Sequence, residues 1–228
     1  APVGTSVIHA ADIPVGPAPT VSVPDRPRRR VHPEPLPSYT PAVRSVSRYA
    51  PAELGHTAGS GMLAIGETIH SILESVATAS IPPDPEALER ETRRLLHLQA
   101  LPEDQEENTV ELILQQLAAL RPSPAWDIVL PQPDSFAELP VIFNLEGNWY
   151  SGRIDRVILT GNEVRVFDYK TFPVDRDHLS RLSREFYESQ LRLYAAACRE
   201  LFPNRMVSTW LVFTALPEIV RSPLTADG

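Results

Sequence analysis

The sequence predicts an α/β fold in which a central mixed β-sheet is flanked by helices. Three observations predict it. Apolar residues recur at helical spacing between residues 60 and 120, strand-like segments follow between residues 139 and 171, and a further helix and strand come after them. Helices, an antiparallel meander, and then a helix and a strand are typical of helices packed on a mixed sheet.

Three segments in the first half have helical periodicity. They are residues 60–78, 85–101 and 108–120. Isoleucines recur every three or four positions in the first of them, which indicates one apolar face. Pro85 lies where the second begins, and the first turn of a helix tolerates proline. The string RPSPAW after the third segment breaks the helical pattern.

The second half is dominated by strand-like segments. Residues 139–145 and 149–159 fit strands, and residues 163–171 are rich in β-branched and aromatic types. A long helix is expected at residues 184–201. Residues 208–214 form a continuous apolar run, as expected for a strand buried in a sheet.

The N-terminal stretch differs in composition from the rest of the chain. Residues 1–37 hold many of the 24 prolines and show no apolar periodicity, so they cannot bury enough surface to offset their ordering entropy. We expect a Pro-rich linker or extended arm there and a single domain at residues 38–228. The chain begins without Met, which suggests a fragment of a longer protein. No run of about 18 apolar residues predicts a transmembrane helix.

Composition narrows the functional classes. Cys198 is the one cysteine, which excludes an internal disulfide and a Cys-ligated zinc or iron–sulfur site, and favours a reducing, cytoplasmic setting. The net charge of −8 argues against binding nucleic acid by bulk electrostatics alone. It argues less against a nuclease, because metal-binding carboxylates add negative charge. Trp126, Trp149 and Trp210 are interpreted as packing residues, with platforms for stacking bases as the alternative.

One predicted hairpin combines acidic and basic residues. If Gly161 and Asn162 form its two-residue loop, Asp155 and Asp168 lie directly opposite each other, with Cβ atoms about 4.5–5.5 Å apart. Two carboxylates so placed repel unless a cation lies between them. Lys170 follows Asp168 by two positions and therefore shares its face. This set offers hard oxygen ligands for Mg²⁺ beside a positive group.

The hairpin alone leaves two interpretations equally open. A half-exposed hairpin without a site also alternates charged residues with Val and Ile. A register slipped by one residue would move one aspartate to the opposite face of the sheet.

Four motifs occur in the order found in one nuclease family. They are GETIHSILE at 66–74, GRIDRV at 152–157, FDYKT at 167–171 and YESQLRLYAAA at 187–197. Together they resemble the RecB-like and AddA-like nuclease domains of the PD-(D/E)XK superfamily, which are C-terminal domains of UvrD/Rep-type helicase–nucleases. The resemblance covers roughly residues 38–214 and implies a restriction-endonuclease-like core.

The resemblance also implies a metal centre. His70, Asp155 and Asp168 would ligate one Mg²⁺, or Mn²⁺ in its place, together with the backbone carbonyl of Tyr169. Lys170 would orient or activate the attacking water and stabilise charge at phosphorus. Relatives with an iron–sulfur cluster use four cysteines, so no cluster is expected here.

Two residues of the last motif complete the implied site. Gln190 and Tyr194 are four positions apart, hence on one helix face, and would brace the lysine and contact the phosphate. The catalytic set is therefore Asp155, Asp168 and Lys170 with these two. Glu138 lies where some relatives keep an acidic residue; it is interpreted as an ordinary strand-edge carboxylate, with ordering of the site as the alternative.

The implied function is metal-dependent hydrolysis of DNA. We expect an exonuclease acting on a single-stranded end, leaving 5′-phosphates, in double-strand-break repair or recombination. No phosphate-binding loop of the G-x-x-x-x-G-K-[ST] type is present, so a helicase domain in the same parent chain or in a partner subunit would feed the strand. The alternatives are a catalytically silent module for DNA binding or subunit docking, and a nuclease not joined to a helicase.

Overall fold

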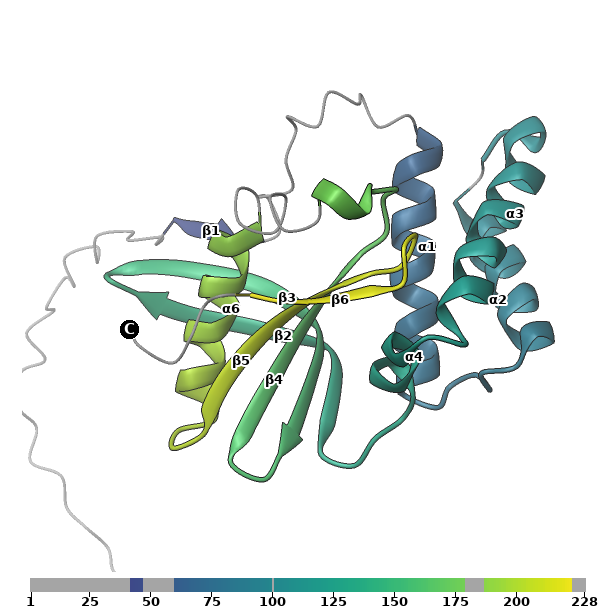
Figure 1. The fold of residues 1–228 in the computed structure, drawn as a ribbon. Helices are drawn as coiled ribbons and strands as arrows, with labels where there is room; N and C mark the ends of the chain where they lie inside the picture. The colour runs from purple at the N-terminus through teal and green to yellow at the C-terminus, as the bar shows by residue number, and fades with distance from the viewer. Residues whose placement is uncertain (1–41, 47–59, 100, 179–186, 223–228) are drawn as a thin grey trace, which may run out of the picture. The chain divides into compact units, whose positions relative to one another are not determined.

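The described part of the molecule is a sheet with helices on both faces. The computed structural model describes residues 42–46, 60–99, 101–178 and 187–222, all within the unit Pro41–Gly228. The predicted arm at residues 1–37 lies outside them. One face of the sheet packs against helices α1 to α4, and the other packs against α6 (Figure 1). The predicted fold class is confirmed.

The predicted helices are present, with some differences at their ends; residues 184–186, where the last was expected to begin, lie outside the described residues. The helices are α1 (Ser60–Ala77), α2 (Pro85–Leu98), α3 (Glu103–Leu120), α4 (Pro124–Val129) and α6 (Glu188–Leu201). The side chain of Asp84 accepts a hydrogen bond from the backbone N–H of Ala87 (2.9 Å), which caps the start of α2. Helix α4 was not predicted, because its prolines suggested a break although Pro124 occupies a tolerated first-turn position. None of the described helices has the length and apolar character needed to span a membrane.

The described residues form a sheet of six strands. They are β1 (Val43–Ser45), β2 (Ser135–Leu145), β3 (Asn148–Thr160), β4 (Glu163–Lys170), β5 (Met206–Phe213) and β6 (Glu218–Arg221). Strands β2, β3 and β4 form the predicted antiparallel meander, and β5 pairs with β4 in parallel, so the sheet is mixed. The short strands β1 and β6 were not predicted, because three or four residues show no clear alternation.

The predicted register of the β3–β4 hairpin is confirmed as far as the strands pair. Thr160 faces Glu163 across a loop in which Gly161 adopts a positive φ of 54°, and the pairing runs to Arg156 opposite Phe167. It ends one pair short of Asp155 and Asp168. Strand β1 pairs with β3 further back, at residues 149–151, so a fork opens between β3 and β4.

The alternation of β3 is broken at this fork. Ile154 and Val157 both pack in the core beneath α6, although three residues of regular strand would put them on opposite faces. Across the β2–β3 pair, Glu138 has a φ of +48° and falls between the paired residues Ala137 and Leu139. A left-handed backbone at a glutamate is strained, and such strain is retained where the surroundings enforce it. The irregular backbone lies where the predicted site residues gather.

Candidate active site

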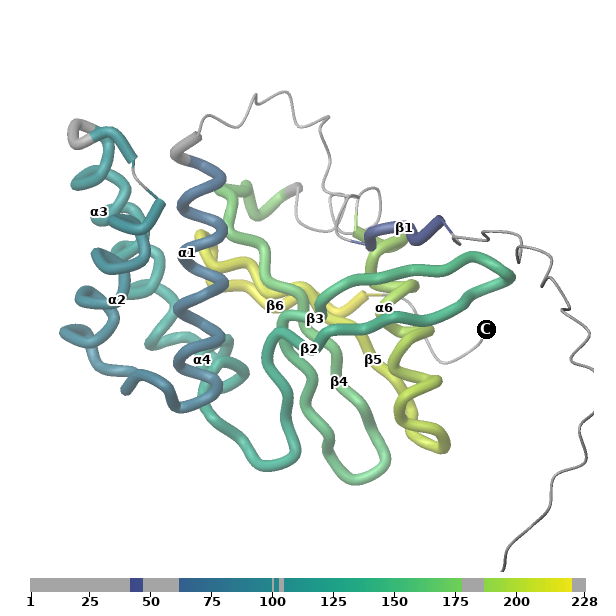
Figure 2. The backbone as a smooth tube through the Cα atoms, turned by 180° about the vertical axis from the view of Figure 1, so that it is seen from behind, coloured from purple at the N-terminus to yellow at the C-terminus, as the bar shows by residue number. Residues whose placement is uncertain are grey.

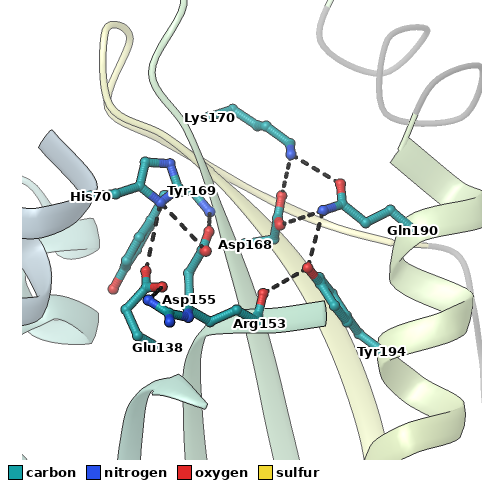
Figure 3. A pocket seen from close by; sticks show the side chains of 9 residues that line it. All are labelled: His70, Glu138, Arg153, Asp155, Asp168, Tyr169, Lys170, Gln190 and Tyr194. Atoms are coloured by element: carbon teal, nitrogen blue, oxygen red, sulfur yellow. Dashed lines mark hydrogen bonds and ion pairs between the residues drawn. The ribbon is translucent and has the colours of Figure 1, made fainter. Parts of the chain in front are cut away.

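A cleft of about 430 Å³ opens at the fork between β3 and β4 (Figure 3). Every sequence-predicted site residue lines it. The lining residues are His70, Glu138, Arg153, Asp155, Asp168, Tyr169, Lys170, Gln190 and Tyr194. They come from α1, β2, β3, β4 and α6, so the fold gathers residues that lie far apart in the sequence.

One half of the cleft holds a cluster of a histidine and two carboxylates. His70 Nδ1 lies 3.4 Å from Asp155 Oδ1 and 3.8 Å from Glu138 Oε1. One turn before His70, helix α1 passes close to the end of β4. The space there is so small that a Cβ on Gly66 would lie 3.1 Å from Thr171 Oγ1. The glycine therefore lets α1 place the imidazole over the sheet.

This cluster has the composition of a metal site. One ligand atom from each of His70, Glu138 and Asp155 lies within 4.8 Å of the other two. Burial lowers the pKa of His70, but Asp155, Glu138 and Asp168 outweigh it and raise that pKa to about 10. Such a negative field favours any cation, and an imidazole with carboxylates suits a divalent metal ion. The donors present therefore fit a divalent metal ion.

Glu138 was misjudged from the sequence. It is not a free strand-edge carboxylate, because it belongs to the cluster with His70 and also lies 3.6 Å from Arg153 Nη1. In the β2–β3 register Glu138 falls opposite Asp155, and this position would have indicated that it belongs to the site. Reading that signal required the strand pairing and the left-handed turn at Glu138, neither of which periodicity reveals.

The other half of the cleft holds the lysine. Lys170 Nζ lies 2.5 Å from Asp168 Oδ2, donates to Gln190 Oε1 (3.1 Å) and sits 4.2 Å from the centre of the Tyr187 ring. Gln190 Nε2 in turn donates to Asp168 Oδ1 (3.1 Å). Lys170 is the chain's single lysine among 21 basic residues, which is consistent with a role that arginine cannot fill.

The two aspartates face different partners within the cleft. Burial raises the pKa of Asp168 to about 6, although Lys170 lowers it, and Asp155 adds to the rise. Asp168 is not part of the group formed by His70, Glu138 and Asp155. Its predicted role as a metal ligand therefore stays a prediction, as does that of the Tyr169 carbonyl.

The backbone groups exposed by the fork are satisfied by site side chains. Asp155 Oδ2 accepts a hydrogen bond from the backbone N–H of Tyr169 (2.6 Å), and Tyr194 OH donates to the carbonyl of Arg153 (2.7 Å). The second contact needs Gly152, because a Cβ there would lie 3.1 Å from the Tyr194 ring and 3.0 Å from Val46 Cβ. The glycine of GRIDRV is thus explained by close packing against α6.

The chain matches one family over most of its length. The sequence profile of the PD-(D/E)XK nuclease superfamily aligns with residues 44–221. The chain belongs to this superfamily. The assignment of Asp155, Asp168 and Lys170 to the family's acidic and lysine positions stays a prediction.

The similarities to individual proteins cover less of the chain than the superfamily match does. The chain is 39% identical over 61 residues to one subunit of an ATP-dependent helicase/nuclease from Oenococcus oeni, and those residues are 27% of this chain and 5% of that protein. Among solved structures it resembles SSO0001 with a TM-score of 0.31 and 18% identity, over 62% of this chain and 78% of the other. A score that low supports no conclusion about function.

Replacing Tyr194 with Phe tests the packing of this PD-(D/E)XK site. The substitution removes the donor to the Arg153 carbonyl and leaves that acceptor unsatisfied beside α6. We expect the free energy of unfolding to fall by about 1–3 kcal/mol. Urea denaturation measures it, with Tyr150→Phe as the control. An unchanged stability would mean that the bond contributes nothing to the fork.

Proposed function

We propose that this domain is a Mg²⁺-dependent deoxyribonuclease, for which Mn²⁺ can substitute. The observation that carries the proposal is the shared cleft. It brings a histidine–carboxylate cluster beside a buried Asp168–Lys170 pair in a member of a nuclease superfamily. Perturbed titratable groups gathered in one cleft are a physical signature of functional sites.

The protein's own groups divide the work. His70, Glu138 and Asp155 would hold the ion, and Asp168 would contribute as well, because a carboxylate has about four acceptor positions and its contacts with Lys170 and Gln190 leave others free. A divalent ion supplies charge that polarises a phosphodiester and lowers the pKa of a nearby water. The Lys170 ammonium, held by three neighbours, presents a fixed positive charge where negative charge grows at phosphorus.

Gln190 and Tyr194 act as positioning residues in this proposal. The Gln190 amide accepts from Lys170 and donates to Asp168, so it fixes the lysine and the aspartate relative to each other. Tyr194 OH lies 3.4 Å from the same amide and donates to the β3 backbone. These bonds support the predicted bracing role. Contact with the phosphate itself remains a proposal.

The substrate proposed is a single-stranded DNA end, cut exonucleolytically to leave 5′-phosphates. The similar stretch in a helicase/nuclease protein supports the proposal that a linked or partner helicase delivers this strand during double-strand-break repair or recombination. A cytoplasmic setting is part of the proposal. No membrane role is proposed.

Metal binding separates this proposal from that of a silent DNA-binding or docking module. We expect calorimetric titration with Mn²⁺ to show one ion bound by the unmutated chain and weaker binding by Asp168→Ala. The exposed Asp127 on α4 gives the control Asp127→Asn, which should bind like the unmutated chain. No binding by the unmutated chain would favour the silent module. Equal binding by Asp168→Ala would remove that carboxylate from the ligand set.

Glu138 provides a second test of the ligand set. Glu138→Gln keeps the size of the side chain but removes its charge beside His70, so we expect Mn²⁺ affinity to fall by about 10-fold or more. Glu146→Gln is a matched control, because Glu146 also has a positive φ (52°) but lies at the β2–β3 turn. Unchanged affinity in Glu138→Gln would show that this carboxylate is not a ligand.

A further inference from the structure

The β2–β3 hairpin carries a row of side chains that starts at Arg153 in the cleft lining and runs beyond the cleft. Beyond the fork, exposed residues of β2 alternate with more buried ones, and β3 pairs with it residue by residue. One face packs against α6 through Val141 and Phe143. The opposite face carries Arg153, Ser151, Trp149, Ile142 and Asn144, with Val43 of β1 beside Trp149. We call these six residues the outer strip.

The outer strip is exposed except at the half-buried Ser151, and it has no partner element among the described residues. Trp149 is 39% exposed, Ile142 72% and Val43 53%. In both views the hairpin extends away from α1 to α4 (Figures 1 and 2). Trp149, interpreted from the sequence as a packing residue, is partly exposed, whereas Trp126 is buried as expected. An exposed tryptophan among apolar neighbours is an uncommon surface feature that marks interaction sites.

The strip is continuous with the cleft. Arg153 lines the cleft and is two residues from Asp155 on the same strand, with its side chain 63% exposed. Trp149 lies four residues before Arg153, a distance of about 13 Å along the strand. An exposed cation next to the site, followed by an aromatic ring, matches the way proteins hold single-stranded nucleic acid. Cations bind the phosphates, and bases stack on aromatic faces.

We propose that the outer strip is a track that guides a single DNA strand into the cleft. Arg153 contacts a phosphate next to the one being cut, and Trp149 stacks on a base further along the strand. The inference rests on the proposed nuclease function and adds a path to it. It also explains how a chain with a net charge of −8 engages DNA, since stacking contributes affinity without charge.

Equilibrium binding of a fluorescein-labelled oligodeoxythymidine 20-mer tests the track. Binding is measured by anisotropy in EDTA and low salt, so that no divalent ion supports cleavage. We expect Trp149→Ala to weaken binding about 10-fold and Trp149→Phe to retain most of it, because Phe keeps a stacking face. Arg153→Gln should weaken binding and reduce the slope of log affinity against log salt by about 0.7.

Two controls match these variants. Phe136→Ala removes an aromatic ring of nearly equal exposure, 40%, at the other end of β2. Arg165→Gln removes an exposed strand arginine that is also paired with a glutamate, Glu163. Both should bind as the unmutated chain does. Tryptophan quenching on binding should disappear in Trp149→Phe, which ties the signal to that ring.

The outcomes separate the track from the proposed function. Unaltered affinity in both Trp149→Ala and Arg153→Gln would overturn the track while leaving the nuclease proposal intact. No binding by the unmutated chain would count against both. If Ile142→Asp instead dissociates a dimer seen by sedimentation and leaves DNA affinity unchanged, the strip is an interface between copies and the inference is wrong.

Discussion

Lys170→Ala is expected to reduce DNA cleavage by about 10²–10³-fold while leaving Mn²⁺ affinity nearly unchanged. The ammonium is not in the cluster with His70, so its loss removes charge stabilisation at the phosphate and not the ion. Lys170→Arg should fail to restore activity. The planar guanidinium does not match the compact site between Asp168, Gln190 and the Tyr187 ring. Single-turnover cleavage of end-labelled DNA measures the rate.

The controls for Lys170 use features specific to this chain. Arg165→Ala removes an exposed cation from the same strand and should cleave normally. Since Lys170 is the single lysine, reductive ¹³C-methylation labels only its Nζ and the α-amino group. The signal from Nζ should report the ring current of Tyr187 in the unmutated chain. Equal rates in Lys170→Ala and the unmutated chain would rule out the proposed role.

Asp155→Asn is expected to cause the largest loss of function. The carboxylate lies 3.4 Å from His70 Nδ1 and belongs to the described cluster of three side chains, with His70 and Glu138, that could hold the ion. A bound ion contributes several kcal/mol to phosphoryl chemistry, so cleavage should fall by about 10³-fold or more. Mn²⁺ titration and cleavage are measured on the same sample.

Asparagine at position 155 separates the effect on function from an effect on folding. Its side-chain oxygen can still accept the hydrogen bond from the Tyr169 N–H, so the fork should persist. Thermal unfolding of Asp155→Asn should therefore resemble that of Asp127→Asn. Retained metal affinity in a folded Asp155→Asn protein would show that the ion binds elsewhere.

Local pattern predicted most of the fold. The isoleucine spacing of α1 and the Gly161–Asn162 loop are signals carried by neighbouring residues, and both led to correct elements. The strands β1 and β6 were not found, because partners distant in the sequence stabilise them. Helix α4 was hidden by its prolines, whose position at a helix start matters more than their presence.

The sequence predicted which residues line the candidate site but not how they divide into two groups within it. Pattern and resemblance identified His70, Asp155, Asp168 and Lys170, all of which line the cleft. The division into a histidine–carboxylate cluster and a lysine pair depends on where β3 and β4 separate, which a simple register could not show. The site role of Glu138 was ranked second for the same reason, since a left-handed turn in β2 brings it to the cluster.

The most direct test of the central claim is digestion of end-labelled single-stranded DNA by the unmutated chain. Parallel reactions contain Mg²⁺ or EDTA, and the products are resolved by length and by end chemistry. The account predicts shortening in Mg²⁺ alone, with 5′-phosphate termini. An intact strand in Mg²⁺, or equal degradation in EDTA, would contradict it.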